Sequence, residues 1–163
     1  MPGPPKDSRR VIESELALLA RRIEHVRRSV RLPDGTTVDR SAYLLLDRID
    51  LAGSPTLAEL GALLQLDQST VHRQVTALEE AGDVERVPDP GGARAARLRL
   101  TAGGRSRLAA TRAGRADRIG RILAGWSPED RATLGSLLAR LNADLVRLGD
   151  DERRRPGSTP PST

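Results

Sequence analysis

The 163-residue chain contains no cysteine, and this absence excludes several classes of protein. Without thiols there is no disulfide framework, no thiolate zinc site and no thiol-based redox sensor. Histidine is nearly as scarce: His25 and His72 are the only two, and they fall on separate expected elements. Neither an acidic cluster at metal-ligand spacing nor a phosphate-cradling glycine loop accompanies them. We therefore expect no enzyme, no metal site and no cofactor.

Aromatic residues are almost missing, since the chain has one tryptophan, one tyrosine and no phenylalanine. Base stacking on aromatic side chains, the usual way to hold single-stranded nucleic acid, is hardly available. Hydrophobic residues make up 37% of the chain, so a core is still expected, built from leucine, isoleucine, valine and alanine. No apolar run approaches the length of a membrane span, and the start has no apolar signal region. A cytoplasmic protein is expected.

Lysine is the third scarcity, because Lys6 is the single lysine among 27 basic residues. The other basic residues are arginines, and with 22 acidic residues the formal net charge is +5. An arginine-based positive excess suits contacts with phosphate and with guanine. A genome that encodes arginine in place of lysine would produce the same composition, so composition alone leaves both explanations open.

Apolar periodicity predicts a mainly helical fold. A first helix begins at Ser8, and a second spans about 40–51 before Gly53. The stripe of the first helix recurs at three and four residues and stops before a Pro-Asp-Gly turn signal. It consists of Leu16, Leu19, Ile23, Val26 and Val30.

The centre of the chain carries start and stop signals for two short helices. Thr56 and Glu59 have capping-box spacing, so each can bond the backbone of the other. Asp67 can cap the next helix, and Gly82 supplies its left-handed stop. Two short helices joined by a three-residue turn predict a helix-turn-helix.

A two-stranded wing is expected after this motif, with strands at 84–87 and 97–100 joined by a long loop. A long helix then runs from Thr101 to about Trp126, and another begins at Ser127 with a continuous leucine stripe. The fold class is thus mainly α, a winged helix-turn-helix with about six helices and a two-stranded β wing. The flanking helices carry more apolar surface than one winged domain covers. Dimerisation is favoured, with packing inside one chain as the alternative.

These elements predict one domain over residues 8–149. The winged helix-turn-helix occupies 40–101, and the dimerisation helices occupy 8–39 and 102–149. The ends, residues 1–7 and about 150–163, are rich in proline, serine, threonine, glycine and charge, and are expected to be disordered tails.

The second short helix has two faces when residues 68–81 are placed on a helical wheel. Val71, Val75 and Leu78 fall together and are expected to face the core. The opposite face and its flanks carry the candidate DNA contacts Ser69, Thr70, His72, Arg73 and Thr76. Small hydroxyls beside a protruding arginine allow close approach to a duplex, and Arg73 is the strongest candidate for a base edge. For each hydroxyl, and for His72, ordinary solvated surface is the alternative.

The stretch from Thr56 to Gly104 resembles the MarR family of bacterial transcriptional regulators. The shared pattern is a Thr-x-x-Glu-Leu helix, a Ser-Thr-Val-x-Arg helix, Leu-Glu-x-x-Gly before a strand, Asp-Pro at the wing, and Leu-x-Leu-Thr-x-x-Gly after it. The resemblance implies a homodimer, a repressor whose two recognition helices read successive major grooves of a palindromic double-stranded operator. By residue, Ser69, Thr70 and Arg73 carry over, whereas His72 replaces a small polar residue.

The resemblance also implies release of DNA by a small-molecule effector bound between the DNA-binding and dimer regions. Tyr43 and Trp126 are the candidate lining residues, and simple packing is the alternative for each. The chain departs from the family at the wing, where Gly92 and Ala93 replace an Asp-Arg pair. A salt bridge that would stiffen the tip is therefore expected to be missing. Arg94 matches the family, and Arg97 and Arg99 are the further candidates for wing contacts with DNA.

Weaker or differently placed contact with the minor groove follows from this departure. The altered wing also supports an alternative function, a dimeric helical module that binds protein partners and has weakened or lost DNA binding. DNA-binding regulation is the favoured interpretation.

Overall fold

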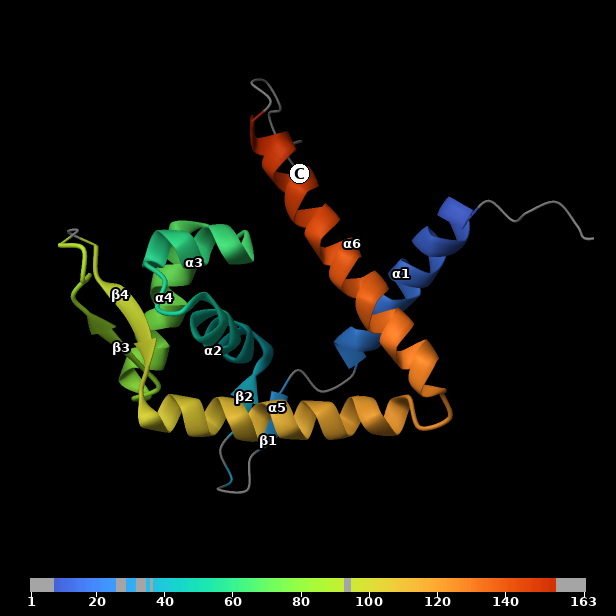
Figure 1. The fold of residues 1–163 in the computed structure, drawn as a ribbon, viewed down its shortest axis with the longest axis horizontal. Helices are drawn as coiled ribbons and strands as arrows, with labels where there is room; N and C mark the ends of the chain where they lie inside the picture. The colour runs from blue at the N-terminus through green and yellow to red at the C-terminus, as the bar shows by residue number, and fades with distance from the viewer. Residues whose placement is uncertain (1–7, 26–28, 32–34, 36, 93–94, 155–163) are drawn as a thin grey trace, which may run out of the picture.

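The computed structural model describes residues 8–25, 29–31, 35, 37–92 and 95–154, and every structural statement below concerns these residues. Here the chain forms six helices and two small antiparallel sheets. The order is α1 (Ser8–His25), β1 (Ser29–Arg31), β2 (Thr37–Asp39), α2 (Arg40–Ala52), α3 (Leu57–Leu64), α4 (Gln68–Glu80), β3 (Val84–Val87), β4 (Arg97–Leu100), α5 (Ala102–Ile122) and α6 (Pro128–Arg154). Figure 1 shows α5 as a straight rod, with α2 to β4 gathered over its first half and α6 leaving from its far end.

The core lies where α2, α3, α4, the β3–β4 sheet and α5 meet. Its buried hydrophobic side chains are all aliphatic: Leu45, Leu46, Ile49, Leu60, Val71, Val75, Leu78, Val84, Leu98, Leu100 and Leu108. The face predicted for α4 is confirmed, since Val71 and Val75 are fully buried. In β4, Leu98 is 1% exposed and joins the same core. Burial of this apolar face holds α4 with its polar face outward.

Local signals placed the start of each element of the helix-turn-helix correctly. The Thr56 hydroxyl accepts from the Glu59 backbone N–H at 3.2 Å, and the Glu59 carboxylate accepts from the Thr56 N–H at 2.8 Å. Asp67 caps α4 as expected, and Gly82 adopts the left-handed conformation with φ 73°. The β3–β4 register, Val84 opposite Leu100 through Val87 opposite Arg97, lies within the predicted strands.

The prediction for the end of the first helix is wrong. α1 ends at His25, and Val30 lies in β1, paired with Val38 of β2. The predicted stripe residue Val26 lies outside the described residues. β-Branched residues flank the Pro-Asp-Gly signal on both sides, which favours a hairpin over a continued helix. Val38 is 3% exposed and packs beside Ala42, Tyr43 and Ala110, so the hairpin covers one side of α2 and α5.

The boundary of the predicted C-terminal tail is also wrong, because α6 continues through residues 150–154. This stretch contains neither proline nor glycine, so nothing in it stops a helix that has already formed. The amide of Gln65 donates to the Val146 carbonyl at 3.2 Å and fastens the last turns of α6 to α3. The helix before α6 is shorter than predicted, because α5 ends at Ile122 and not near Trp126. Residues 1–7 and 155–163 lie outside the described residues.

The base of the wing rests closely on the first turn of α5. Thr101 caps α5 by accepting from the Gly104 N–H, and its hydroxyl donates to the Gly82 carbonyl at 2.6 Å. Gly104 is buried, and a Cβ there would overlap the backbone carbonyl of Asp83. Arg107 donates to the Asp83 carboxylate at 3.0 Å. Burial raises the pKa of Asp83, while Arg107 opposes that rise.

Large apolar side chains are exposed on several surfaces, including Leu51 and Leu63 on α2 and α3, and the three larger groups concern the helices that flank the winged domain. They lie on α1, at the end of α5 with the turn after it, and on α6. The most exposed members are Ile12, Ile119, Ile122, Leu137, Leu145 and Leu148. No helix in the described ranges combines the length and apolar character that crossing a bilayer requires.

Candidate nucleic-acid interface

The outer face of α4 is the first part of the candidate interface. Ser69, His72 and Arg73 are exposed, and Thr70 and Thr76 are half-buried at its edges. All five predicted residues therefore lie away from the buried stripe, on one accessible helix. Arg73 is the one arginine of α4, and no residue that the structure describes bonds its guanidinium.

The hydroxyls on this face are already hydrogen-bonded within the protein. Ser69 Oγ and Thr70 Oγ1 each donate to the Asp67 carboxylate at 2.6 Å, and the Thr70 N–H donates to it at 2.8 Å. These bonds hold the pKa of Asp67 far below its usual range, with the Ser69 bond as the largest cause. Thr76 Oγ1 donates to the His72 carbonyl at 3.0 Å. The N-cap was predicted, but the recruitment of both hydroxyls by Asp67 was not.

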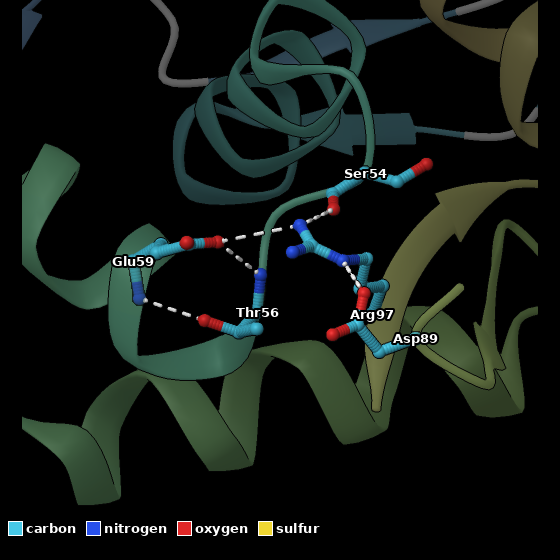
Figure 2. A network of polar contacts seen from close by, with 5 residues as sticks. All are labelled: Ser54, Thr56, Glu59, Asp89 and Arg97. Atoms are coloured by element: carbon cyan, nitrogen blue, oxygen red, sulfur yellow. Dashed lines mark hydrogen bonds and ion pairs between the residues drawn. The ribbon is translucent and has the colours of Figure 1, made fainter. Parts of the chain in front are cut away.

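The second part of the candidate interface is the wing, where Arg97 lies at the centre of a polar network (Figure 2). Its Nε donates to Asp89 at 2.6 Å, and Nη1 donates to the Ser54 carbonyl at 3.1 Å. The same Nη1 lies 3.8 Å from the Glu59 carboxylate. The hydrogen bond to Asp89 raises the pKa of Arg97, so the guanidinium stays charged. The network ties the wing loop to the α2–α3 connection and the N-terminus of α3.

This network changes the expectation for wing stiffness. The family salt bridge at the tip has no counterpart at Gly92, but the Asp89–Arg97 pair braces the loop from its base. Backbone pairing adds to the brace, because the Leu98 N–H donates to the Pro55 carbonyl at 2.8 Å and Thr56 bridges to Arg97. The other tip positions, Ala93 and the candidate contact Arg94, lie outside the described residues.

The remaining arginines of the two wing strands are also paired with acids. Arg99 lies 3.0 Å from Glu85, its partner across the sheet. Arg86 binds the Glu79 carboxylate through two nitrogens at 2.7 and 3.2 Å. The positive charge of β3 and β4 is thus balanced inside the protein, whereas Arg73 on α4 is not.

The structure gives Tyr43 and Trp126 different surroundings. Tyr43 is half-buried on α2, and the Arg115 guanidinium lies 4.1 Å above its ring centroid. Burial lowers the pKa of Arg115, while Tyr43 opposes that shift. Trp126 is 46% exposed in the turn between α5 and α6. The two side chains are not brought together into one site.

Two hollows lie elsewhere. A pocket of about 330 Å³ opens between β2, α2, α4 and α5, with Ser41, Gln74, Asp83 and Arg107 among its polar walls. A larger groove of about 1300 Å³ runs between α6 and the α2–α3 region. Neither is lined by Tyr43 or Trp126. Within the described ranges no group of three or more histidine or acidic side chains is arranged to hold a metal ion.

Comparison with known proteins matches this architecture. The model of the MarR family covers residues 36–95, which run from β2 into the wing loop. An uncharacterised HTH-type transcriptional regulator of Bacillus subtilis (strain 168), YxaD, is 33% identical over 136 residues. That alignment covers 83% of this chain and 94% of YxaD.

Solved structures agree with the sequence comparison. Streptococcus pneumoniae FabT in complex with DNA is 26% identical with a TM-score of 0.64, covering 87% of this chain and 99% of FabT. A mutant MarR from E. coli complexed with operator DNA is also 26% identical, with a TM-score of 0.54. Here 64% of this chain and 75% of MarR are covered.

Proposed function

This chain belongs to the MarR family of transcriptional regulators, and we propose that it is a dimeric repressor of a palindromic duplex operator. The observation that carries the proposal is the construction of α4. Its apolar side is fully buried, while Arg73 and the small hydroxyls stand on the accessible side. A helix held in this way can enter a major groove with its N-terminal residues foremost.

The proposed DNA contacts on α4 follow from the placement of its side chains, with Ser69, Thr70, His72, Arg73 and Thr76 toward the major groove. On the wing, Arg94 is proposed from the sequence alone to contact the backbone or the minor groove, and Arg99 joins it only if its pair with Glu85 opens. Arg97 has two of its nitrogens bonded to Asp89 and Ser54, so a DNA contact there would require these bonds to break. We assign Arg97 instead to positioning the wing.

Dimerisation is supported by the exposed apolar faces of α1, α5 and α6. Leu137 and Leu148 are both more than half exposed on α6, although a single chain gains stability by burying such residues. A second copy that covers these faces would place two α4 helices for two half-sites. Trp126 stands among them, so we propose that it belongs to the dimer surface rather than to an effector site.

Relief by a small molecule is supported by the pocket beside Gln74 and Arg107. A ligand there would touch both the recognition helix and α5, and so could change the angle between them. Tyr43 does not line this pocket, although its chain neighbour Ala42 does.

Duplex selection tests the proposal. The purified protein is mixed with random duplexes and with DNA from beside its own gene, and bound species are recovered at two salt concentrations. We expect a sequence with inverted symmetry, bound with an affinity that falls steeply as salt rises. Sedimentation of the free protein at the same concentration is expected to give twice the chain mass.

The alternative is a dimeric module for protein partners. The observation that favours it is the pairing of Arg86, Arg97 and Arg99 with acids, which leaves β3 and β4 little free positive charge. A dimer that binds no duplex in a salt-dependent manner would support this alternative. Arg94→Ala adds a local check, with Arg121→Ala, an exposed change on α5, as the control. Under the repressor proposal Arg94→Ala weakens operator binding more than Arg121→Ala does, and equal effects would favour the alternative.

A further inference from the structure

We propose that Ser69, Thr70 and Thr76 act toward DNA as hydrogen-bond acceptors, so that α4 selects bases which present an amino group in the major groove. These bases are adenine, through N6, and cytosine, through N4. The inference rests on the proposed function, since it assigns the chemistry that the same helix reads.

The direction of each hydroxyl proton follows from its partner. A serine or threonine hydroxyl has one proton to donate and two lone pairs to accept with. A charged carboxylate only accepts, so the 2.6 Å contacts to Asp67 require Ser69 and Thr70 to donate their protons inward. What these two oxygens can offer to an approaching duplex is lone pairs.

Thr76 also donates its hydroxyl proton within the protein, but to a different partner. Its proton goes to the His72 carbonyl one turn earlier at 3.0 Å, and a carbonyl also only accepts. The three hydroxyls of the predicted DNA-facing side are therefore alike, although they are fixed by two separate partners.

This polarity decides which DNA groups fit. Phosphate oxygens, guanine O6 and N7, and thymine O4 are acceptors, so they do not satisfy a hydroxyl whose proton is already used. If Ser69 turned its proton toward a phosphate, Asp67 would lose a donor while a second negative charge approached it. Amino groups of adenine and cytosine can bond the hydroxyls with no rearrangement. Arg73 only donates, so it takes the complementary role toward guanine and phosphate.

Asp67 is thus a positioning residue for specificity, and its amide variant, Asp67→Asn, reverses part of the pattern. The cap itself is retained, because asparagine caps helices about as well as aspartate. The amide oxygen still accepts from the Thr70 N–H and from Ser69. The amide NH₂ group donates to Thr70 Oγ1, which then turns its own proton outward. The variant therefore converts Thr70 from an acceptor into a donor toward DNA.

Modified duplexes test the inference directly. In a duplex recovered by random selection, each adenine is replaced by purine deoxyriboside, which lacks the 6-amino group, and each cytosine by its analogue without the 4-amino group. Replacement by 7-deazaadenine, which lacks only the N7 acceptor, is the matched control. At one or more positions we expect loss of the amino group to weaken wild-type binding about fivefold or more, which is the worth of one hydrogen bond. Where that position is an adenine, replacement by 7-deazaadenine is expected to have no effect.

Two variants test whether the loss of binding on removal of an amino group comes from α4. Thr70→Val, which keeps the side-chain shape, is expected to abolish the response at one of these positions. Asp67→Asn is expected to reduce the same response and to create a new sensitivity to 7-deazaadenine. Unchanged thermal unfolding and helical circular dichroism would show that the cap survives.

Two results would overturn the inference. One is a wild-type protein for which no amino-group deletion matters, and the other is a wild-type sensitivity to 7-deazaadenine that Thr70→Val abolishes. Failure to recover any selectively bound duplex is a different result, because it contradicts the proposed function itself.

Discussion

The recognition helix α4 and the wing differ in how they hold their positive charge. Arg73 on α4 is exposed and unbonded by the described residues, whereas Arg86, Arg97 and Arg99 of the wing each meet an acid. In the described part of the wing there are more arginines than on α4, but each is paired, so they offer less positive charge to phosphate. A count of basic residues therefore overstates the contribution of the wing, and the bonding of each guanidinium is the better guide.

The two regions also differ in what fixes them. α4 is held by burial of Val71, Val75 and Leu78, a contribution from the apolar core. The wing sheet has Leu98 and Leu100 in that core, but its loop depends on the polar brace centred on Arg97 and on the fit of Asp83 against α5. Substitutions can therefore disturb the wing while leaving α4 in place.

The largest effect is expected from Gly104→Ala. The added Cβ would overlap the Asp83 carbonyl, so the base of the wing must move away from α5. We expect a loss of about 1–3 kcal/mol or more in the free energy of unfolding, as for other overpacked sites. Urea denaturation followed by circular dichroism measures it.

Gly103→Ala is the matched control for that experiment. The neighbouring glycine also lies in α5, and its Cβ would make only ordinary contacts at 3.6 and 3.7 Å. Because alanine favours a helix over glycine by about 0.5–1 kcal/mol, the control is expected to be neutral or stabilising. Equal destabilisation by both changes would contradict the close packing described for Gly104.

A smaller effect is expected from Arg97→Ala. The change removes the hydrogen bonds to Asp89 and Ser54, so the wing loop loses its tie to the α2–α3 connection. We expect a lower Tm than for Arg99→Ala, which removes one exposed pair with Glu85. Calorimetry measures the Tm of both variants. A larger fall in Tm for Arg99→Ala than for Arg97→Ala would contradict the stabilising role assigned to the Arg97 network.

The smallest effect is expected from Glu85→Gln, which releases Arg99 for phosphate. Binding to random duplex should strengthen, and the slope of log affinity against log salt should steepen by up to about 0.9 for each phosphate newly contacted. Titration of labelled duplex at several salt concentrations measures the slope. Glu129→Gln, an exposed change at the start of α6, is the control and should leave it unchanged.

Much of α4 and its surroundings could be predicted from the sequence, because the signals are local. The Thr56–Glu59 box, the Asp67 cap and the Gly82 stop each act within three or four residues. The buried stripe of α4 follows equally from helical periodicity. Their agreement explains why the helix-turn-helix was placed within about one residue of its observed bounds.

The brace of the wing could not be predicted in the same way. Arg97 bonds Ser54, which is 43 residues away, and Asp89 across the wing loop, and no periodic pattern relates these positions. A strand alternation places Arg97 outward but does not say which acid it meets. The hairpin of β1 and β2 was missed for a different reason. Val30 continues an apolar spacing that fits a helix, but in the structure it forms a strand pair with Val38 instead.

Whether α4 reads sequence while the wing adds little selectivity can be measured most directly as a ratio of affinities. Wild type, Arg73→Ala and Arg99→Ala are titrated with the selected operator and with a scrambled duplex in the same salt. We expect Arg73→Ala to lower the preference for operator by about 1–3 kcal/mol and Arg99→Ala to leave it unchanged. An unchanged preference in Arg73→Ala, or an equal loss in both variants, would contradict this expectation.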